Sequence, residues 1–218
     1  MVDQDRVRVA IEATPKRAFA TAVDWPGWSR GAKTPAAALD ALAAYRDRYA
    51  AGIAPARVGV PPAHPELEIV EEIEGNASTE FGVPGTVAAA DRAPLDGREA
   101  ERRAALVAAA WATFERVAGS APTELRKGPR GGGRDTAKIV AHVVASDAGY
   151  QRELGLRLPE PDPTDARAVG ALHDAMLAVL RRPSNGQPIV KRWTTRYAAH
   201  RIGWHSLDHA WEIEDRSS

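Results

Sequence analysis

Two histidines near the end of the chain have a spacing that suits metal binding. His205 and His209 are four residues apart in a stretch whose apolar residues recur at helical spacing. On an α-helix this spacing places the two side chains about 40° apart on one face, on successive turns. Two imidazoles in this position can bind the same ion. The spacing therefore predicts a metal-binding pair, with an ordinary polar helix face as the alternative.

Other polar residues of the same predicted helix lie near this pair. Glu212 falls on the histidine face, and we take it as the candidate catalytic residue. It would act as a general base, as a fourth ligand or as a partner that fixes an imidazole tautomer; a solvated carboxylate is the alternative. Arg201, adjacent to this face, is the candidate for binding an anionic substrate. Asp208 is either an acceptor for an imidazole or a surface acid, and His200 falls on nearly the opposite side.

A third ligand has to come from another helix, and His142 is the candidate. It stands among the apolar neighbours Ile139, Val140, Val143 and Val144, so we expect it to point inward. It is either a third ligand or a buried neutral histidine with a hydrogen-bond partner. Three neutral imidazoles would leave coordination positions open, as a catalytic ion requires. Such an ion lowers the pKa of a water or a thiol that binds to it.

The elements that position these residues follow from the hydrophobic pattern. In the N-terminal part, apolar and charged residues alternate as in a strand with one buried face, and Thr34-Pro35 is a typical helix start. The order is β-β-β-α-β. The expected elements are strands at about 6–13, 18–23 and 28–32, a helix at about 35–50 and a strand at about 67–73.

Four helical stretches follow a segment that is rich in glycine, proline, alanine and aspartate. Short or breaker-rich loops between helices of this length are typical of an antiparallel four-helix bundle. We therefore predict an α+β protein with a small α/β domain at 1–75, a linker at 76–97 and a bundle at 98–218. The expected helices are at about 98–118, 135–154, 165–181 and 191–215.

The N-terminal pattern resembles the HicB-like fold of antitoxins. The residues that carry the likeness are Val7 to Glu12, Ala18 to Val23, Asp24-Trp25-Pro26-Gly27-Trp28 with Gly31, and Lys33-Thr34-Pro35. HicB antitoxins usually carry a DNA-binding segment after this module, and no such segment is visible here. The resemblance implies an alternative function, namely a regulatory or partner-binding protein in which the bundle serves as scaffold and dimer interface.

The C-terminal pattern resembles the DinB/YfiT-like metalloenzyme superfamily. The likeness is carried by Ala141-His142-Val143-Val144 through Tyr150 and by His205-x3-His209 in the last helix. It implies that His142, His205 and His209 hold one divalent metal, with zinc as the first choice and nickel, iron or manganese as alternatives. It also implies thiol-dependent transferase or isomerase chemistry. Because the chain has no cysteine, the thiol would come from a small cofactor such as mycothiol.

The amino-acid composition limits which other classes of function are expected. Lys plus Arg and Asp plus Glu are both 29, so nucleic-acid binding through net positive charge is not expected. We find no apolar run long enough for a membrane span and no signal peptide, and expect a cytoplasmic protein. Trp204 and Trp211 share a helical stripe, which indicates core or homodimer contacts. We expect a homodimer that acts on a small-molecule substrate; a metal-containing bundle without turnover is a further alternative.

Overall fold

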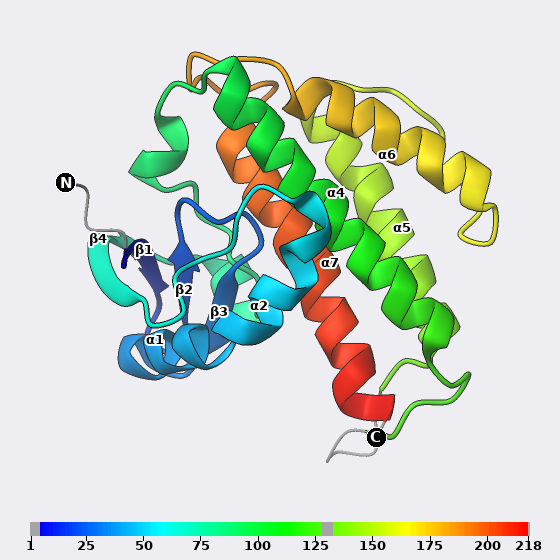
Figure 1. The fold of residues 1–218 in the computed structure, drawn as a ribbon, viewed down its shortest axis with the longest axis horizontal. Coiled ribbons are helices and arrows are strands. Elements are labelled where there is room, and N and C mark those ends of the chain that lie inside the picture. The colour runs from blue at the N-terminus through cyan, green and yellow to red at the C-terminus, as the bar shows by residue number, and fades with distance from the viewer. Residues whose placement is uncertain (1–4, 128–132, 218) are drawn as a thin grey trace.

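A computed structural model describes residues 5–127 and 133–217, and within them the protein is a mixed α+β structure. Figure 1 shows the sheet on one side and the long helices on the other. The strands are β1 (Arg6–Ala13), β2 (Ala18–Ala22), β3 (Ser29–Ala32) and β4 (Glu66–Glu74). The helices are α1 (Pro35–Ala44), α2 (Arg46–Ile53), α3 (Ala77–Phe81), α4 (Gly97–Ser120), α5 (Thr136–Glu153), α6 (Ala166–Leu180) and α7 (Thr195–Ser217).

The sheet has the strand order β3-β2-β1-β4, with β1 antiparallel to β2 and parallel to β4. A parallel pair requires a crossover connection, which the α1–α2 segment supplies. Along the chain, the expected succession of three strands, a helical segment and a fourth strand is present. The single helix expected at about 35–50 is wrong, because the chain bends at Tyr45 (φ −91°, ψ 2°) and continues as α2. The bend places the Tyr45 ring against Trp211, with ring centroids 5.0 Å apart.

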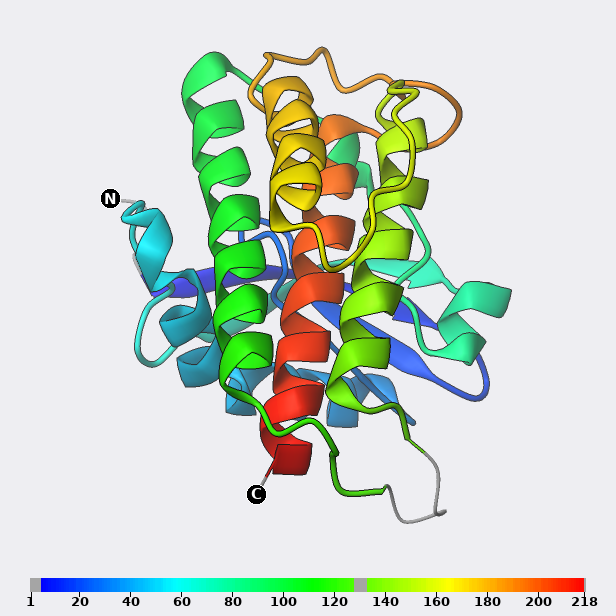
Figure 2. The same cartoon turned by 90° about the vertical axis from the view of Figure 1, so that its right-hand side faces the viewer.

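The four long helices pack against one another. Figure 2 shows α7 between α4 and α5, and α6 contacts α4, α5 and α7. The expected start of the last helix at 191 is wrong. Helix α7 begins at Thr195, because Thr194 caps it: its side-chain oxygen accepts from the Tyr197 N–H at 3.2 Å, and its carbonyl accepts from the Ala198 N–H at 2.9 Å. None of the described helices has the length and apolarity needed to cross a membrane.

A buried polar contact ties three of these helices together. Asp147 on α5 is fully buried, and one of its oxygens lies 3.0 Å from Nε1 of Trp111 on α4 and 3.0 Å from Nε2 of His173 on α6. Trp111 also stacks on His173, with ring centroids 3.8 Å apart. Burial raises the pKa of Asp147, and the two donors offset part of the cost of burying its charge.

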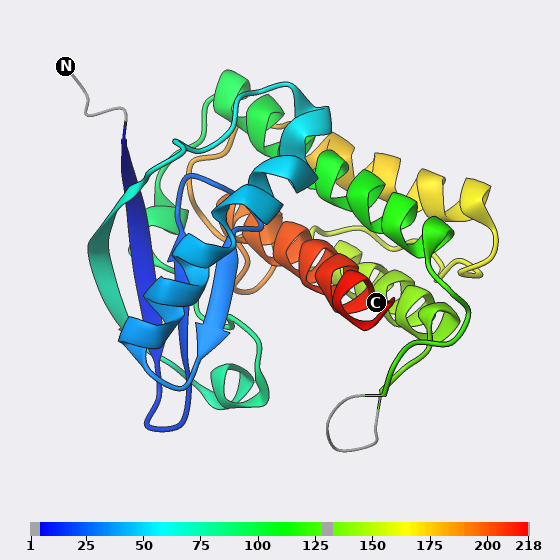
Figure 3. The ribbon, with the colours of Figure 1, turned by 60° about the horizontal axis from the view of Figure 1, so that its bottom comes forward.

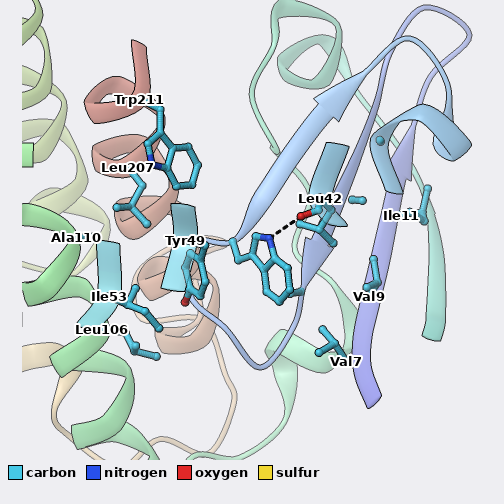
Figure 4. Packing of buried hydrophobic residues seen from close by; sticks show 14 of the residues in the cluster. Val7, Val9, Ile11, Leu42, Tyr49, Ile53, Leu106, Ala110, Leu207 and Trp211 are labelled. Atoms are coloured by element: carbon cyan, nitrogen blue, oxygen red, sulfur yellow. Dashed lines mark hydrogen bonds between the residues drawn. The ribbon is translucent and has the colours of Figure 1, made fainter. Parts of the chain in front are cut away.

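One hydrophobic cluster joins the sheet to the long helices (Figure 4). The indole N–H of Trp28 donates to the carbonyl of Leu42 at 2.9 Å, and its ring stacks on Tyr49. Leu106 of α4 and Leu207 of α7 belong to the same cluster and are fully buried. The core therefore crosses from the segment predicted as the α/β domain into the segment predicted as the bundle.

The segment predicted as a linker, 76–97, packs against the sheet. It contains α3 and a 3-10 turn at Ala89–Arg92. The carboxylate of Glu12 on β1 is buried and accepts hydrogen bonds from the Thr79 hydroxyl and from the N–H groups of Gly85 (3.1 Å) and Thr86 (3.0 Å). The sheet consequently has α1 on one face and this segment on the other, while α7 approaches the second face as well (Figure 3).

Candidate metal centre

Three imidazoles from two helices converge on one point. His142 of α5 and His205 and His209 of α7 each offer one ring nitrogen, and these three atoms lie within 4.8 Å of one another. The Nε2 atoms of His142 and His205 are 3.3 Å apart. Two ligand nitrogens on a tetrahedral zinc ion lie about 3.3 Å apart, given a zinc–nitrogen bond of about 2.0 Å. The donor set and its spacing therefore fit a divalent ion.

Glu212 lies within hydrogen-bond distance of His209. Its Oε2 lies 2.8 Å from Nδ1 of His209, and its Oε1 accepts from Arg216 at 2.8 Å. The hydrogen bond from His209 lowers the pKa of Glu212, although burial opposes it. An ionised Glu212 holds the proton on Nδ1 and leaves Nε2 free to bind a metal. Glu212 is not part of the converging group; its position corresponds to the predicted role of tautomer-fixing partner.

Burial keeps two of the histidines neutral. His205 is 5% exposed, and burial lowers its pKa well below the ordinary value. Burial, with the nearby charge of Arg134, lowers the pKa of His142 to about 4. The neutral imidazole is the form that binds metals. His142 and His209 are only partly buried, so the group is in contact with solvent on their side.

Arg201 lies one helical turn before His205. Its guanidinium is 4.8 Å from the Trp204 ring and 5.3 Å from the Tyr150 ring, and Tyr150 in turn contacts His205 with ring centroids 5.7 Å apart. Nη1 of Arg201 is buried and has no hydrogen-bond partner among the described residues. A buried guanidinium donor without an acceptor favours an anionic group beside it. The structure thus places the predicted substrate-binding residue next to the histidines.

A small cavity of about 30 Å³, which Arg201 also lines, lies between the sheet and α7. Its walls include Glu12, Asp91 and His200. Burial raises the pKa of Asp91 to about 6 and, with the charge of Arg103, lowers the pKa of His200 to about 3. Sequence reasoning missed Glu12 and Asp91 as buried groups. The alternation of β1 predicts that Glu12 is exposed. It is buried because segment 76–97 covers it.

Of the remaining candidates on α7, His200 and Asp208 have partners other than the three imidazoles, whereas the Trp204 ring lies 6.2 Å from the His205 ring between centroids. His200 donates from Nε2 to the Val23 carbonyl at 3.0 Å, which agrees with its exclusion from the predicted site. Asp208 pairs with Arg30 at 2.7 Å and so has no contact with an imidazole. Trp204 packs edge-on against Phe19, and Trp211 packs against the Tyr45 ring. Both tryptophans therefore serve contacts within the chain, and the homodimer stays a prediction.

No protein-family model, curated protein or solved structure matches this chain. A functional interpretation therefore depends on the geometry and chemistry of the site.

Proposed function

We propose that this protein is a metal-dependent enzyme in which His142, His205 and His209 hold a divalent ion. The observation that carries the proposal is the convergence of three imidazole nitrogens from two helices within 4.8 Å. Zinc is the first choice because it accepts a tetrahedral set of nitrogen ligands, and nickel, iron and manganese are the alternatives. When bound, such an ion lowers the pKa of a water or a thiol at its open position.

The residues around the histidines have separate tasks in this proposal. Glu212 keeps His209 in the tautomer that binds metal. Arg201 supplies the guanidinium whose unpaired Nη1 binds an anionic group of the substrate. The partly exposed side at His142 and His209 admits the small molecule.

A low-molecular-weight thiol is the proposed co-substrate, and group transfer or isomerisation is the proposed reaction class. The chain has no cysteine, so a thiol has to be supplied by a small molecule such as mycothiol. The resemblance to DinB/YfiT-like metalloenzymes supports this class. The cytoplasm, where small thiols are kept reduced, is the expected compartment.

The proposed architecture is a HicB-like unit followed by a DinB-like antiparallel four-helix bundle. The strand-strand-strand-helix-strand order of the first part and the packing of α4, α5, α6 and α7 support it. In this arrangement the bundle carries all three ligands, and the HicB-like unit covers α7.

Metal analysis tests the proposal directly. Chelator-treated protein is reconstituted separately with zinc, nickel, iron and manganese, dialysed and analysed by mass spectrometry. We expect about one ion per chain for the preferred metal and almost none in the double variant His205→Ala, His209→Ala. His64→Ala is the matched control, because His64 is exposed and outside the site. Metal content that is absent in the wild type, or unchanged in the double variant, would refute the proposal.

A second measurement separates an enzyme from a metal-containing bundle without turnover. The reconstituted protein is assayed with mycothiol and with other small thiols against electrophilic acceptors, and its melting temperature is measured in parallel. Turnover that is lost in the double variant supports the enzyme. A metal that raises only the melting temperature, with no turnover for any thiol, supports the bundle without turnover.

A further inference from the structure

A second concave site lies at the beginning of α7. It is a cleft of about 380 Å³ between the segment Gly85–Arg92 and the loop Pro188–Trp193 that leads into α7. A volume of this size is typical of small-molecule sites. In Figure 2 the loop arches over the end of the long helices. The cleft is separate from the three histidines, none of which lines it.

The charge around this cleft is one-sided. Its walls carry Arg92, Lys191 and Arg192, and no aspartate or glutamate. In the part of the chain that the structure describes, none of these three side chains has an ion-pair or hydrogen-bond partner. Three cations of like charge around one hollow repel one another and raise the local positive potential. The cleft therefore favours a ligand with several negative charges.

The contacts around the cleft hold its walls in place. Arg196, the next basic residue along the chain, donates to the carbonyls of Ala93 (3.1 Å) and Pro94 (2.8 Å), and so ties the segment to α7. The Tyr197 hydroxyl donates to the Pro84 carbonyl at 3.1 Å. A hollow whose walls are already positioned loses less conformational entropy when a ligand binds.

An aromatic wall completes the site. Trp193 packs edge-on against Tyr197, with ring centroids 5.2 Å apart, and also contacts Tyr150 at 5.1 Å. Tyr197 and Thr86 line both this cleft and the small cavity that includes Arg201. Aromatic side chains offer an apolar surface to an organic ligand, and the basic groups orient its acidic ends.

We propose that this cleft binds a small organic molecule that carries two or more oxyanion groups, either carboxylates or phosphates. The three basic side chains bind the oxyanions, and Trp193 contacts the carbon skeleton. Because the proposal depends on the cleft alone, it holds whether or not the histidines bind a metal.

Binding to chelator-treated protein tests this site without any contribution from a metal. Isothermal titration in a buffer of low ionic strength uses two probes, propane-1,2,3-tricarboxylate and inorganic pyrophosphate. We expect submillimolar binding of at least one probe, and the tighter one identifies carboxylate or phosphate as the preferred group. The test variant is Arg92→Gln, Lys191→Gln, Arg192→Gln. The control is Arg98→Gln, Lys138→Gln, Arg182→Gln, which removes the same charge from exposed positions outside the cleft.

The test variant should bind at least about tenfold more weakly than the control. Equal weakening in both variants would show nonspecific attraction and overturn the proposal, as would the absence of submillimolar binding to the wild type. All six side chains are exposed, and circular dichroism checks that both variants fold. Tryptophan fluorescence is the second readout: ligand should change it in the wild type but not in Trp193→Phe. A change that persists in Trp193→Phe would place the ligand elsewhere and overturn the proposal.

Discussion

Glu212 and Arg216 show how individual residues prepare the histidine site. Glu212 binds Nδ1 of His209, and Arg216 donates to the other oxygen of Glu212. His205 has no such partner: its Nδ1 is buried and unpaired among the described residues. Ring packing and the Nε2 contact with His142 orient His205, whereas a charged hydrogen bond orients His209.

The variant Glu212→Gln tests this role. An amide is a weaker acceptor than a carboxylate, so the Nδ1 proton of His209 is held less firmly, and metal affinity should fall by about tenfold. Competition with a chromophoric chelator measures the dissociation constant. The control is Arg216→Gln, which removes the ion pair and leaves the His209–Glu212 hydrogen bond. Equal affinities for Glu212→Gln and the wild type would contradict the role.

His200 predicts a pH dependence of stability. In the folded protein its pKa is about 3, mainly because of burial, whereas in the unfolded chain it is about 6.5. Below pH 6.5 the unfolded state therefore takes up a proton that the folded state does not, and stability falls with pH. Between pH 6.5 and 5 the wild type should lose about 2 kcal/mol relative to His200→Gln. Urea unfolding of both proteins at both pH values measures this difference in the free energy of unfolding. Equal losses of stability in the wild type and in His200→Gln would contradict the prediction.

At the level of elements, two glycines allow the turn after β2 to touch α7. Gly27 has a left-handed φ of +93°, and a Cβ on it would lie 3.0 Å from the backbone carbon of Gly203. A Cβ on Gly203 would lie 3.3 Å from the backbone N and Cα of Gly27. Backbone atoms cannot move aside as a flexible side chain can, so the sheet and the helix that carries His205 meet closely only because both residues lack a side chain.

The pair Gly203→Ala and Gly149→Ala tests this contact. Both glycines lie inside helices, where alanine is intrinsically favoured by up to about 1 kcal/mol. A Cβ on Gly149 meets nothing within 4 Å, so Gly149→Ala should stabilise the protein by about 0.5–1 kcal/mol. In contrast, Gly203→Ala should destabilise it by about 1 kcal/mol, because overpacking exceeds the helical gain. Denaturant titration compares the free energies of unfolding of the two variants. If Gly203→Ala stabilised the protein, the contact between Gly27 and Gly203 would be loose.

The whole molecule is organised around a core that both predicted domains share. The cluster extends from the β1 side chains through Trp28 and Tyr49 to Leu106 of α4 and Leu207 of α7. Asp208 and Arg30 add an ion pair at 2.7 Å across the same boundary. Neither part buries its apolar surface without the other, which couples their stability.

Thermal unfolding should therefore be a single cooperative transition. Near-ultraviolet and far-ultraviolet circular dichroism should have coincident midpoints, and the calorimetric and van't Hoff enthalpies should agree. Leu207→Ala, which opens a cavity at the boundary, should lower the free energy of unfolding by about 2–5 kcal/mol and keep the transition single. Two separate transitions in the wild type would instead mean that the α/β part and the long helices unfold independently.

The local sequence pattern was sufficient to predict most of the helices and strands. Alternation predicted β1, the segment at 67–73 was expected to be extended and forms β4, and apolar spacing predicted α4, α5 and α6 to within two residues at each end. Two boundaries differ from the prediction: the chain bends at Tyr45, whose ring contacts Trp211, and α7 begins at Thr195, after the Thr194 cap, rather than at 191. Strand and helix periods are properties of neighbouring residues, whereas a bend such as that at Tyr45 depends on what the chain packs against.

For the site, spacing alone placed His205 and His209 on one helix face, since four residues are about one turn of any helix. That His142 meets them, that Glu212 binds Nδ1 of His209 and that Glu12 is buried were decided by tertiary structure. These contacts join residues far apart in the chain or select one rotamer among several. Packing of α5 against α7 and of segment 76–97 against the sheet supplies that information, because burial and long-range distance are properties of the folded chain.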